Sequence, residues 1–115
     1  MADNIAALRQ LLLCAPRETL PITYQQAATA LSLTPPRTIA QVTQALEQLM
    51  REDAAQHKPF LAALVVSRRG ESLPAAGFFE LAVALGRFPA DATLHEAAYR
   101  GEFQRALSER ENLNQ

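Results

Sequence analysis

Apolar residues at helical spacing predict three helices in the first half of the chain. These helices cover residues 4–14, about 23–31 and about 38–53. In the first and third, an apolar residue recurs every three or four positions, which is the pattern of a helix with one buried face. Thr23 and Gln26 have the spacing of a capping box, in which each side chain bonds a free amide at the helix start. Thr38 and Gln41 repeat this spacing, and a proline pair at 35–36 must break the chain ahead of them.

The middle of the chain adds strand and turn signals. Residues 60–67 form a strand-length apolar run with paired valines, and a polar turn of the kind that forms a wing follows at 68–72. Pro21–Ile22 can supply a short partner strand. The two capped helices alone fit an ordinary helical hairpin equally well. The strand and the turn favour a winged helix-turn-helix core.

Two more helices are predicted in the C-terminal part. Apolar residues from Phe78 to Leu85 indicate one helix, which Gly86 is well placed to end. Pro89 marks the break after it. Thr93 and Glu96 offer a third capping-box spacing, which begins the last helix.

Length and composition fit one soluble domain. The 115 residues are 49% hydrophobic and 20% charged. We expect a mainly α fold with a small β-hairpin or wing. Residues 1–107 would form one winged-helix-like domain with a C-terminal helical extension, and 108–115 a flexible tail. Cys14 cannot form an internal disulfide and no secretory signal precedes it, so a cytoplasmic location is expected. The longest apolar run, 60–66, is too short to span a bilayer, and no membrane role is expected.

Charge limits the ways in which this chain can bind nucleic acid. A net charge of -1 and a pI near 6.1 exclude the global basic field that drives nonspecific binding to phosphates. A contact with DNA therefore needs a local basic cluster. The candidates are Arg37, Arg51, Arg68 and Arg69.

The third predicted helix carries side chains that can read bases. Its polar face offers Gln41, Gln44, Gln48 and Arg51. Glutamine can bond adenine through two hydrogen bonds, and arginine can bond guanine or phosphate. Tyr24, at the start of the second helix, can contact DNA or simply pack its ring. Glu47 and Glu52 act against DNA binding, and a merely solvated helix face is the alternative interpretation.

Several short segments, in their order along the chain, resemble a known family. They are Ile22–Ala28, Pro36–Ile39 and Leu64–Val66 with a turn at Gly70. Together they are similar to the DNA-binding winged-helix domain of the O6-alkylguanine-DNA alkyltransferases and the alkyltransferase-like proteins, over about residues 20–82. The resemblance implies a winged-helix fold, and it puts Arg37 where the family has an arginine that enters the duplex. The same order of elements also resembles small uncharacterised bacterial proteins of winged-helix type.

The chemistry of that family does not carry over. Its strand has a cysteine nucleophile followed by histidine and arginine. Here those positions hold Ala62, Ala63 and Leu64. Alanine cannot supply the thiolate that alkyl transfer needs, and Cys14 lies elsewhere, at the end of a predicted helix where we expect a small buried side chain. His95 begins a near match to a metalloprotease helix motif, but Tyr99 stands where the second histidine ligand should be. We therefore expect no enzyme activity, metal or cofactor.

Two hypotheses about function remain open. In the first, the chain is a non-catalytic, regulatory protein that binds double-stranded DNA. Its third helix enters the major groove with Arg37 and Gln41 or Gln44, and Arg68 and Arg69 hold the backbone. In the second, it is a protein-interaction module of the same fold that contacts a partner or a second copy of itself. The expected contact residues are then Phe78, Phe79, Leu85, Phe88, Tyr99 and Phe103. The charge favours the second hypothesis and the order of elements the first.

Overall fold

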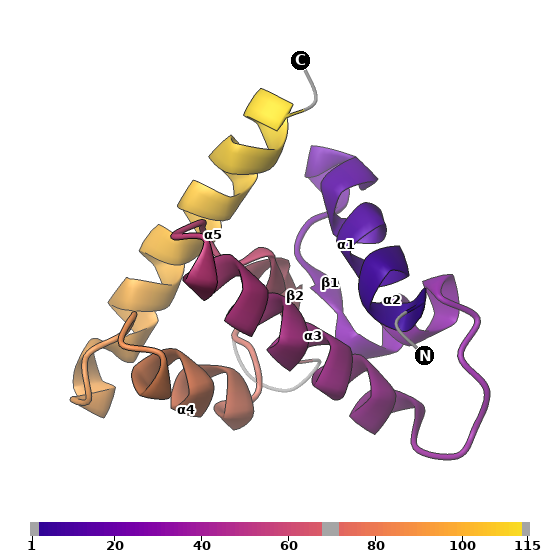
Figure 1. The fold of residues 1–115 in the computed structure, drawn as a ribbon, viewed down its shortest axis with the longest axis horizontal. Coiled ribbons are helices and arrows are strands. Elements are labelled where there is room, and N and C mark those ends of the chain that lie inside the picture. The colour runs from indigo at the N-terminus through magenta and orange to yellow at the C-terminus, as the bar shows by residue number, and fades with distance from the viewer. Residues whose placement is uncertain (1–2, 68–71, 114–115) are drawn as a thin grey trace.

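The computed structural model describes residues 3–67 and 72–113, and it is mainly helical, as predicted. In chain order its elements are α1 (Asp3–Cys14), η1 (Arg17–Thr19), β1 (Ile22–Thr23), α2 (Tyr24–Ala30), α3 (Thr38–Ala55), η2 (Leu61–Leu64), β2 (Val65–Val66), α4 (Ala76–Ala84), η3 (Ala92–Leu94) and α5 (His95–Leu113), where η marks a 3-10 helix. Figure 1 shows α3 crossing the middle of the molecule, with α1 and α2 on one side and α4 and α5 on the other. The predicted helix 4–14 and the break between α2 and α3 are confirmed.

The two strands form a small parallel sheet, which corrects the expected β-hairpin. Ile22 pairs with Val65, and Thr23 pairs with Val66. A parallel pair needs a long crossover connection, and the segment with α2 and α3, which lies between the strands in sequence, supplies it. The expected partner strand near Pro21–Ile22 is present, one residue further along the chain.

The predicted strand at residues 60–67 is mostly a 3-10 helix. Leu61–Leu64 forms η2, and only Val65–Val66 is extended and paired. Every residue from Phe60 to Val66 is buried, so the apolar run did identify the core of the molecule. A continuous apolar run does not distinguish a buried strand from a buried helical turn, and here most of it forms the turn.

The helix ends follow the predicted signals only in part. At α2 the capping box is confirmed: Thr23 accepts from the amide of Gln26 at 3.1 Å, and the Gln26 side chain accepts from the amide of Thr23 at 2.9 Å. At α4 the predicted stop at Gly86 is also confirmed. Its φ of 77° lies in the left-handed region, and the amide of Arg87 donates to the carbonyl of Ala82 at 2.9 Å.

The two other capping boxes expected from the sequence are wrong. The residue before α3 is Arg37, with φ 63°, and its side chain makes no cap. Ahead of η3, Asp91 accepts from the amide of Thr93 at 2.9 Å, so Asp91 supplies the cap expected from Thr93. A spacing of three residues between suitable side chains occurs often without forming a cap, because the backbone before the helix decides which residue stands at its start.

The last helix continues well past residue 107, where a flexible tail was expected. Residues 108–113 belong to α5. Arg110 is 5% exposed, and its guanidinium donates to the carbonyl of Ala15 at the end of α1. Arg17 also forms an ion pair with Glu111. The end of α5 is therefore held against α1, and only residues 114–115 of the expected tail lie outside the described part of the chain.

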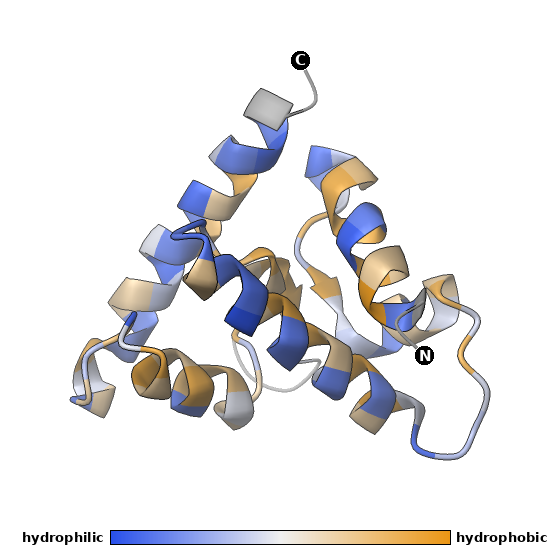
Figure 2. Cartoon of the chain, in the orientation of Figure 1, coloured by the Kyte–Doolittle hydropathy of each residue, from blue (hydrophilic) through white to orange (hydrophobic). Residues whose placement is uncertain are grey.

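Aromatic rings gather in the core around Phe78. Its ring meets those of Phe60, Phe88 and Tyr99 edge to face, at centroid distances of 6.0, 5.7 and 6.0 Å. The Tyr99 hydroxyl donates to the carbonyl of Ala63 at 2.9 Å, so α5 is bonded directly to η2. These contacts join α4, α5 and η2 around one point. In Figure 2 most of α4 has the colours of hydrophobic residues, whereas α5 is largely hydrophilic.

Two buried carboxylates fix the turn that leads into η2. Asp53, on α3, is 2% exposed and accepts from the amide of Leu61 at 3.2 Å and from Arg9 of α1 at 3.0 Å. Burial raises the pKa of Asp53, and the Leu61 amide and Arg9 offset this only in part. The hydrogen bonds from Leu61 and Arg9 therefore hold the Asp53 carboxylate in its buried position.

The second carboxylate, Glu102 of α5, is 1% exposed. It accepts from the amide of Phe60 at 2.7 Å, and from Arg87 and Arg105 at 2.8 and 2.7 Å. Arg87 in turn donates to the carbonyl of Lys58 at 3.0 Å and lies over the Phe60 ring at 4.3 Å. Successive amides of this turn are thus bonded by carboxylates from two different helices.

We predict that Val65→Asp unfolds the protein. Val65 is 0% exposed, and a carboxylate placed there without a partner costs about 4 kcal/mol or more of unfolding free energy. Thermal unfolding followed by circular dichroism measures this loss. The control is Ile39→Asp, at a position that is 39% exposed, which should melt close to the wild-type temperature. A native melting curve for Val65→Asp would show that β2 is not part of the core.

We also predict that Glu102→Gln lowers the unfolding free energy by about 3 kcal/mol, because it leaves the arginines around a buried site without their counter-charge. Glu96→Gln is the matched control on the same helix. Glu96 pairs with Arg100 at the surface, at 3.2 Å, and its loss should cost less than about 1 kcal/mol. Urea unfolding of both variants measures the two losses of unfolding free energy. Equal losses would mean that the Glu102 cluster does not hold the turn.

Candidate functional site

The outward face of α3 carries most of the residues that sequence analysis selected for DNA contact. This face lies between α1 and α4, and the first half of α3 projects away from α4 and α5 (Figure 1). Residues three or four apart along a helix share a face, and the selected residues follow that spacing. From the start of the helix they are Arg37, Gln41, Gln44, Gln48 and Arg51.

Arg37 stands at the exposed end of this face. It precedes the first turn of α3, and within the described part of the chain its guanidinium has no hydrogen bond or ion pair. No acidic side chain lies in the first turn of α3. The positive end of the helix dipole and a free guanidinium therefore lie side by side.

Gln41 and Gln44 follow Arg37 along the helix, and they differ in their hydrogen bonding. The amide of Gln41 donates to the carbonyls of Thr34 and Pro36, at 3.0 and 3.1 Å, so it holds the loop that carries Arg37. It is committed to this internal contact. Gln44 is exposed and borders a shallow hollow beside the first turn of α1. Of these two glutamines, Gln44 is the one with a free amide.

Further along α3 the polar side chains pair with one another. Gln48 donates to Glu52 at 3.4 Å, and Arg51 lies 4.0 Å from Glu47. Glu52 also pairs with Arg9 at 2.9 Å. The two glutamates that counted against DNA binding are thus engaged by basic side chains of the same molecule.

Tyr24 packs rather than facing solvent. It is half-buried, and its hydroxyl accepts from the amide of Ala75 at 2.8 Å, which fixes the segment ahead of α4 to α2. Burial raises the pKa of Tyr24, and the Ala75 amide lowers it in part. Of the two interpretations of Tyr24, the geometry supports packing.

The remaining two selected residues, Arg68 and Arg69, lie outside the described residues. The chain on either side of them is held together: the amide of Ser67 donates to the carbonyl of Leu73 at 2.9 Å. The described residues on either side of this segment, Ser67 and Leu73, are thus joined by a hydrogen bond.

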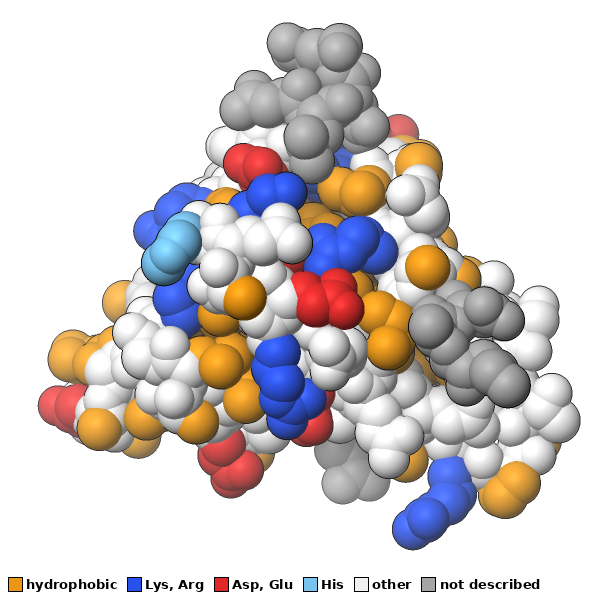
Figure 3. Space-filling model, in the orientation of Figure 1, with side chains coloured by type: hydrophobic (Ala, Val, Ile, Leu, Met, Phe, Trp, Pro, Cys, Tyr) orange, Lys and Arg blue, Asp and Glu red, His pale blue; other side chains and the backbone are white. Residues whose placement is uncertain are grey.

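Charge divides this face of the molecule into two regions. From Leu20 to Leu46 the chain contains no aspartate or glutamate, and its one charged residue is Arg37. This stretch includes α2, the loop and the first half of α3. In Figure 3 the corner over the loop is accordingly almost uncharged, apart from one basic side chain. The acidic residues of α3 begin at Glu47.

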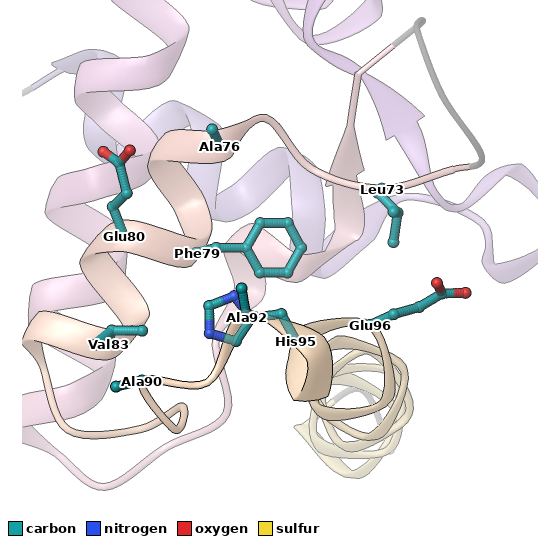
Figure 4. Close-up of a pocket in the computed structure, with 9 residues that line it drawn as sticks. All are labelled: Leu73, Ala76, Phe79, Glu80, Val83, Ala90, Ala92, His95 and Glu96. Atoms are coloured by element: carbon teal, nitrogen blue, oxygen red, sulfur yellow. The ribbon is translucent and has the colours of Figure 1, made fainter.

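A second feature, which sequence analysis did not identify as a groove, lies between α4 and the start of α5. Figure 4 shows the residues that line it. They are Leu73, Ala76, Phe79, Glu80, Val83, Ala90, Ala92, His95 and Glu96. The groove is open, with a volume of about 740 Å³, and most of its lining is apolar.

The groove is lined by one of the four phenylalanines expected to meet a partner. Phe79 lines it, and its ring stacks on His95 at a centroid distance of 5.4 Å. Phe78 and Phe88 are 6% and 5% exposed, so the expectation that they contact a partner is wrong. Both rings are packed in the core. The His95 ring is also held in place, since its Nε2 lies 2.7 Å from the carbonyl of Pro89.

Comparisons of the chain with protein-family models, with curated proteins and with solved structures gave no match. Among the described residues, no helix has the length and apolar content needed to cross a membrane. The same residues contain no group of three or more histidine, cysteine, aspartate or glutamate side chains placed to hold a metal ion. Cys14 is exposed, not buried as expected.

We predict that alkaline pH destabilises the fold through its two tyrosines. Burial raises the pKa of Tyr99 from the ordinary 10.0 to about 12. Between those values the unfolded chain gives up a proton that the folded protein keeps, so the unfolding free energy falls as pH rises. Urea unfolding between these two pH values should show the fall in unfolding free energy. In Tyr99→Phe the unfolding free energy should fall less steeply with pH. A slope unchanged in that variant would contradict the burial of the Tyr99 hydroxyl.

Proposed function

We propose that this chain is a non-catalytic, DNA-binding helix-turn-helix protein that contacts the duplex through the loop before α3 and the first half of that helix. The supporting observation is the exposed, acid-free end of α3, which presents Arg37 and Gln44 with no internal partner for the guanidinium. Helix-turn-helix proteins place the N-terminal residues of their second helix against base edges. α2 and α3 follow one another in the order that this arrangement needs.

The roles of the side chains follow from their surroundings. Arg37 contacts a phosphate or a guanine edge, and Gln44 contacts a base. Gln41 acts indirectly, because its bonds to Thr34 and Pro36 hold the loop in place. Arg68 and Arg69, in the expected wing, would add phosphate contacts on the flank.

The overall negative charge is compatible with this proposal because the acidic side chains of α3 are already engaged. Glu47 lies within reach of Arg51 and beside the first turn of α4, where a Cβ added to Gly77 would be 3.7 Å from its Oε2. A carboxylate at the start of a helix is favourable. Glu52 is paired with Arg9. Electrostatic attraction to DNA should therefore be local and modest, and most binding should be lost at moderate salt.

The decisive experiment measures duplex binding by Arg37→Glu. Fluorescence anisotropy with a labelled duplex of random sequence, at an ionic strength of about 0.01 M, should show binding by the wild type. Arg37→Glu should weaken it about tenfold, because a phosphate contact is replaced by repulsion. Circular dichroism should show an unchanged fold, since Arg37 is exposed.

The matched control is Arg100→Glu, which makes the same charge change at an exposed position of α5. Arg100 pairs there with Glu96. This variant should leave duplex affinity close to that of the wild type. Equal losses in the two variants would indicate nonspecific attraction, and no binding by the wild type would reject DNA as the ligand.

A further inference from the structure

The groove between α4 and the start of α5 is built on a rigid floor. Phe79 stacks on His95 with the two rings 5° from parallel, and Phe79 also contacts Phe78 edge to face at 5.4 Å. The His95 ring is held by the carbonyl of Pro89. Because these rings are anchored to the core and to the α4–α5 connection, the groove is formed in advance and does not depend on a ligand to open it.

The lining of the groove is apolar and accessible. Ala76, Ala90 and Ala92 are exposed, while Leu73, Phe79 and Val83 are half-buried and present part of their side chains. Figure 3 shows hydrophobic side chains gathered over α4 and its connection to α5, with acidic side chains at their margin. An exposed apolar concavity of this kind on a small protein marks a binding surface.

The two carboxylates that line the groove are both exposed to solvent. Glu80 and Glu96 lie on opposite sides of the stacked rings in Figure 4. Within the described residues Glu80 makes no ion pair, and Glu96 is paired only with Arg100 at the surface. Asp91 is also exposed, between the lining residues Ala90 and Ala92. The Thr93 hydroxyl and amide hold its pKa below the usual range.

The basic residue of the α4–α5 connection faces the interior. Between Ser72 and Tyr99, Arg87 is the one lysine or arginine. It is bonded to buried Glu102 and to the carbonyl of Lys58, so it does not neutralise the surface around the groove. The groove therefore combines an apolar floor with a negative rim.

We propose that this groove binds a segment of a partner protein in which apolar residues are flanked by lysine or arginine. The apolar side chains of the segment cover Phe79, Val83 and the exposed alanines, and its basic residues meet Glu80 and Glu96. Amphipathic segments bind hydrophobic grooves between helices in this way. The charge of the rim selects against acidic segments and increases the association rate of basic ones.

This surface is separate from the one assigned to DNA. The loop before α3 and the α4–α5 groove occupy different corners of the molecule in Figure 1. The two proposals are therefore independent: either can fail without affecting the other, and the protein has room to hold DNA and a partner together.

The test begins with a phage-displayed library of random peptides selected on the intact protein. Selected peptides should combine apolar residues with lysine or arginine on either side. A synthetic peptide of that sequence should lose affinity about tenfold for Glu80→Lys, because an attractive contact becomes a repulsive one, and also in high salt. Ala92→Lys, which places a long charged side chain in the groove, should weaken binding at least as much.

The matched control is Glu18→Lys, the same charge change at an exposed residue of η1. It should leave peptide affinity unchanged, and all three variants should melt like the wild type. No enriched peptide, enrichment of acidic peptides, or equal losses for Glu80→Lys and Glu18→Lys would overturn the proposal. Sedimentation equilibrium that shows a dimer broken by Ala92→Lys would also overturn it, since a second copy would then occupy the groove.

Discussion

The turn between α3 and η2 depends on two carboxylates that come from opposite sides of it. Asp53 accepts from the amide of Leu61, and Glu102 accepts from the amide of Phe60. A buried amide without an acceptor costs free energy, and so does a buried carboxylate without a donor, so each group stabilises the other. Because Arg9 and Arg87 complete the bonding, this point joins α1, α3, α5 and the α4–α5 connection.

Much of the surface follows from this arrangement. Asp53 holds the C-terminal end of α3, while Val42, Ala45 and Leu46 pack its first half into the core. Arg37 and Gln44 lie on the opposite, exposed side. At the same time Arg87 is drawn inward to Glu102, and the outer side of α4 keeps only acidic charge. The buried network thus keeps Arg87 away from the surface around the groove.

The two surfaces favour different kinds of partner. The corner at α3 offers a guanidinium and an amide at the positive end of a helix, which suits phosphates and base edges. The groove offers aromatic and aliphatic area with carboxylates around it, which suits a basic, apolar peptide. Each hypothesis formed from the sequence thus has a candidate surface, and the groove proposed for a protein segment is lined by Phe79 without Phe78 or Phe88.

The sequence by itself determined the features that depend on near neighbours. Apolar spacing located the helices, the prolines at 35–36 broke the chain between α2 and α3, and Gly86 ended α4, because periodicity and backbone angles act over a few residues. Only the tertiary structure decided what depends on distant partners. The carboxylates that bend residues 60–61 bring together positions such as Phe60 and Glu102, which lie 42 residues apart, and no local pattern marks them. The same reason explains the parallel pairing of β1 with β2, the extension of α5 against α1, and the groove, whose walls come from two helices packed by the core.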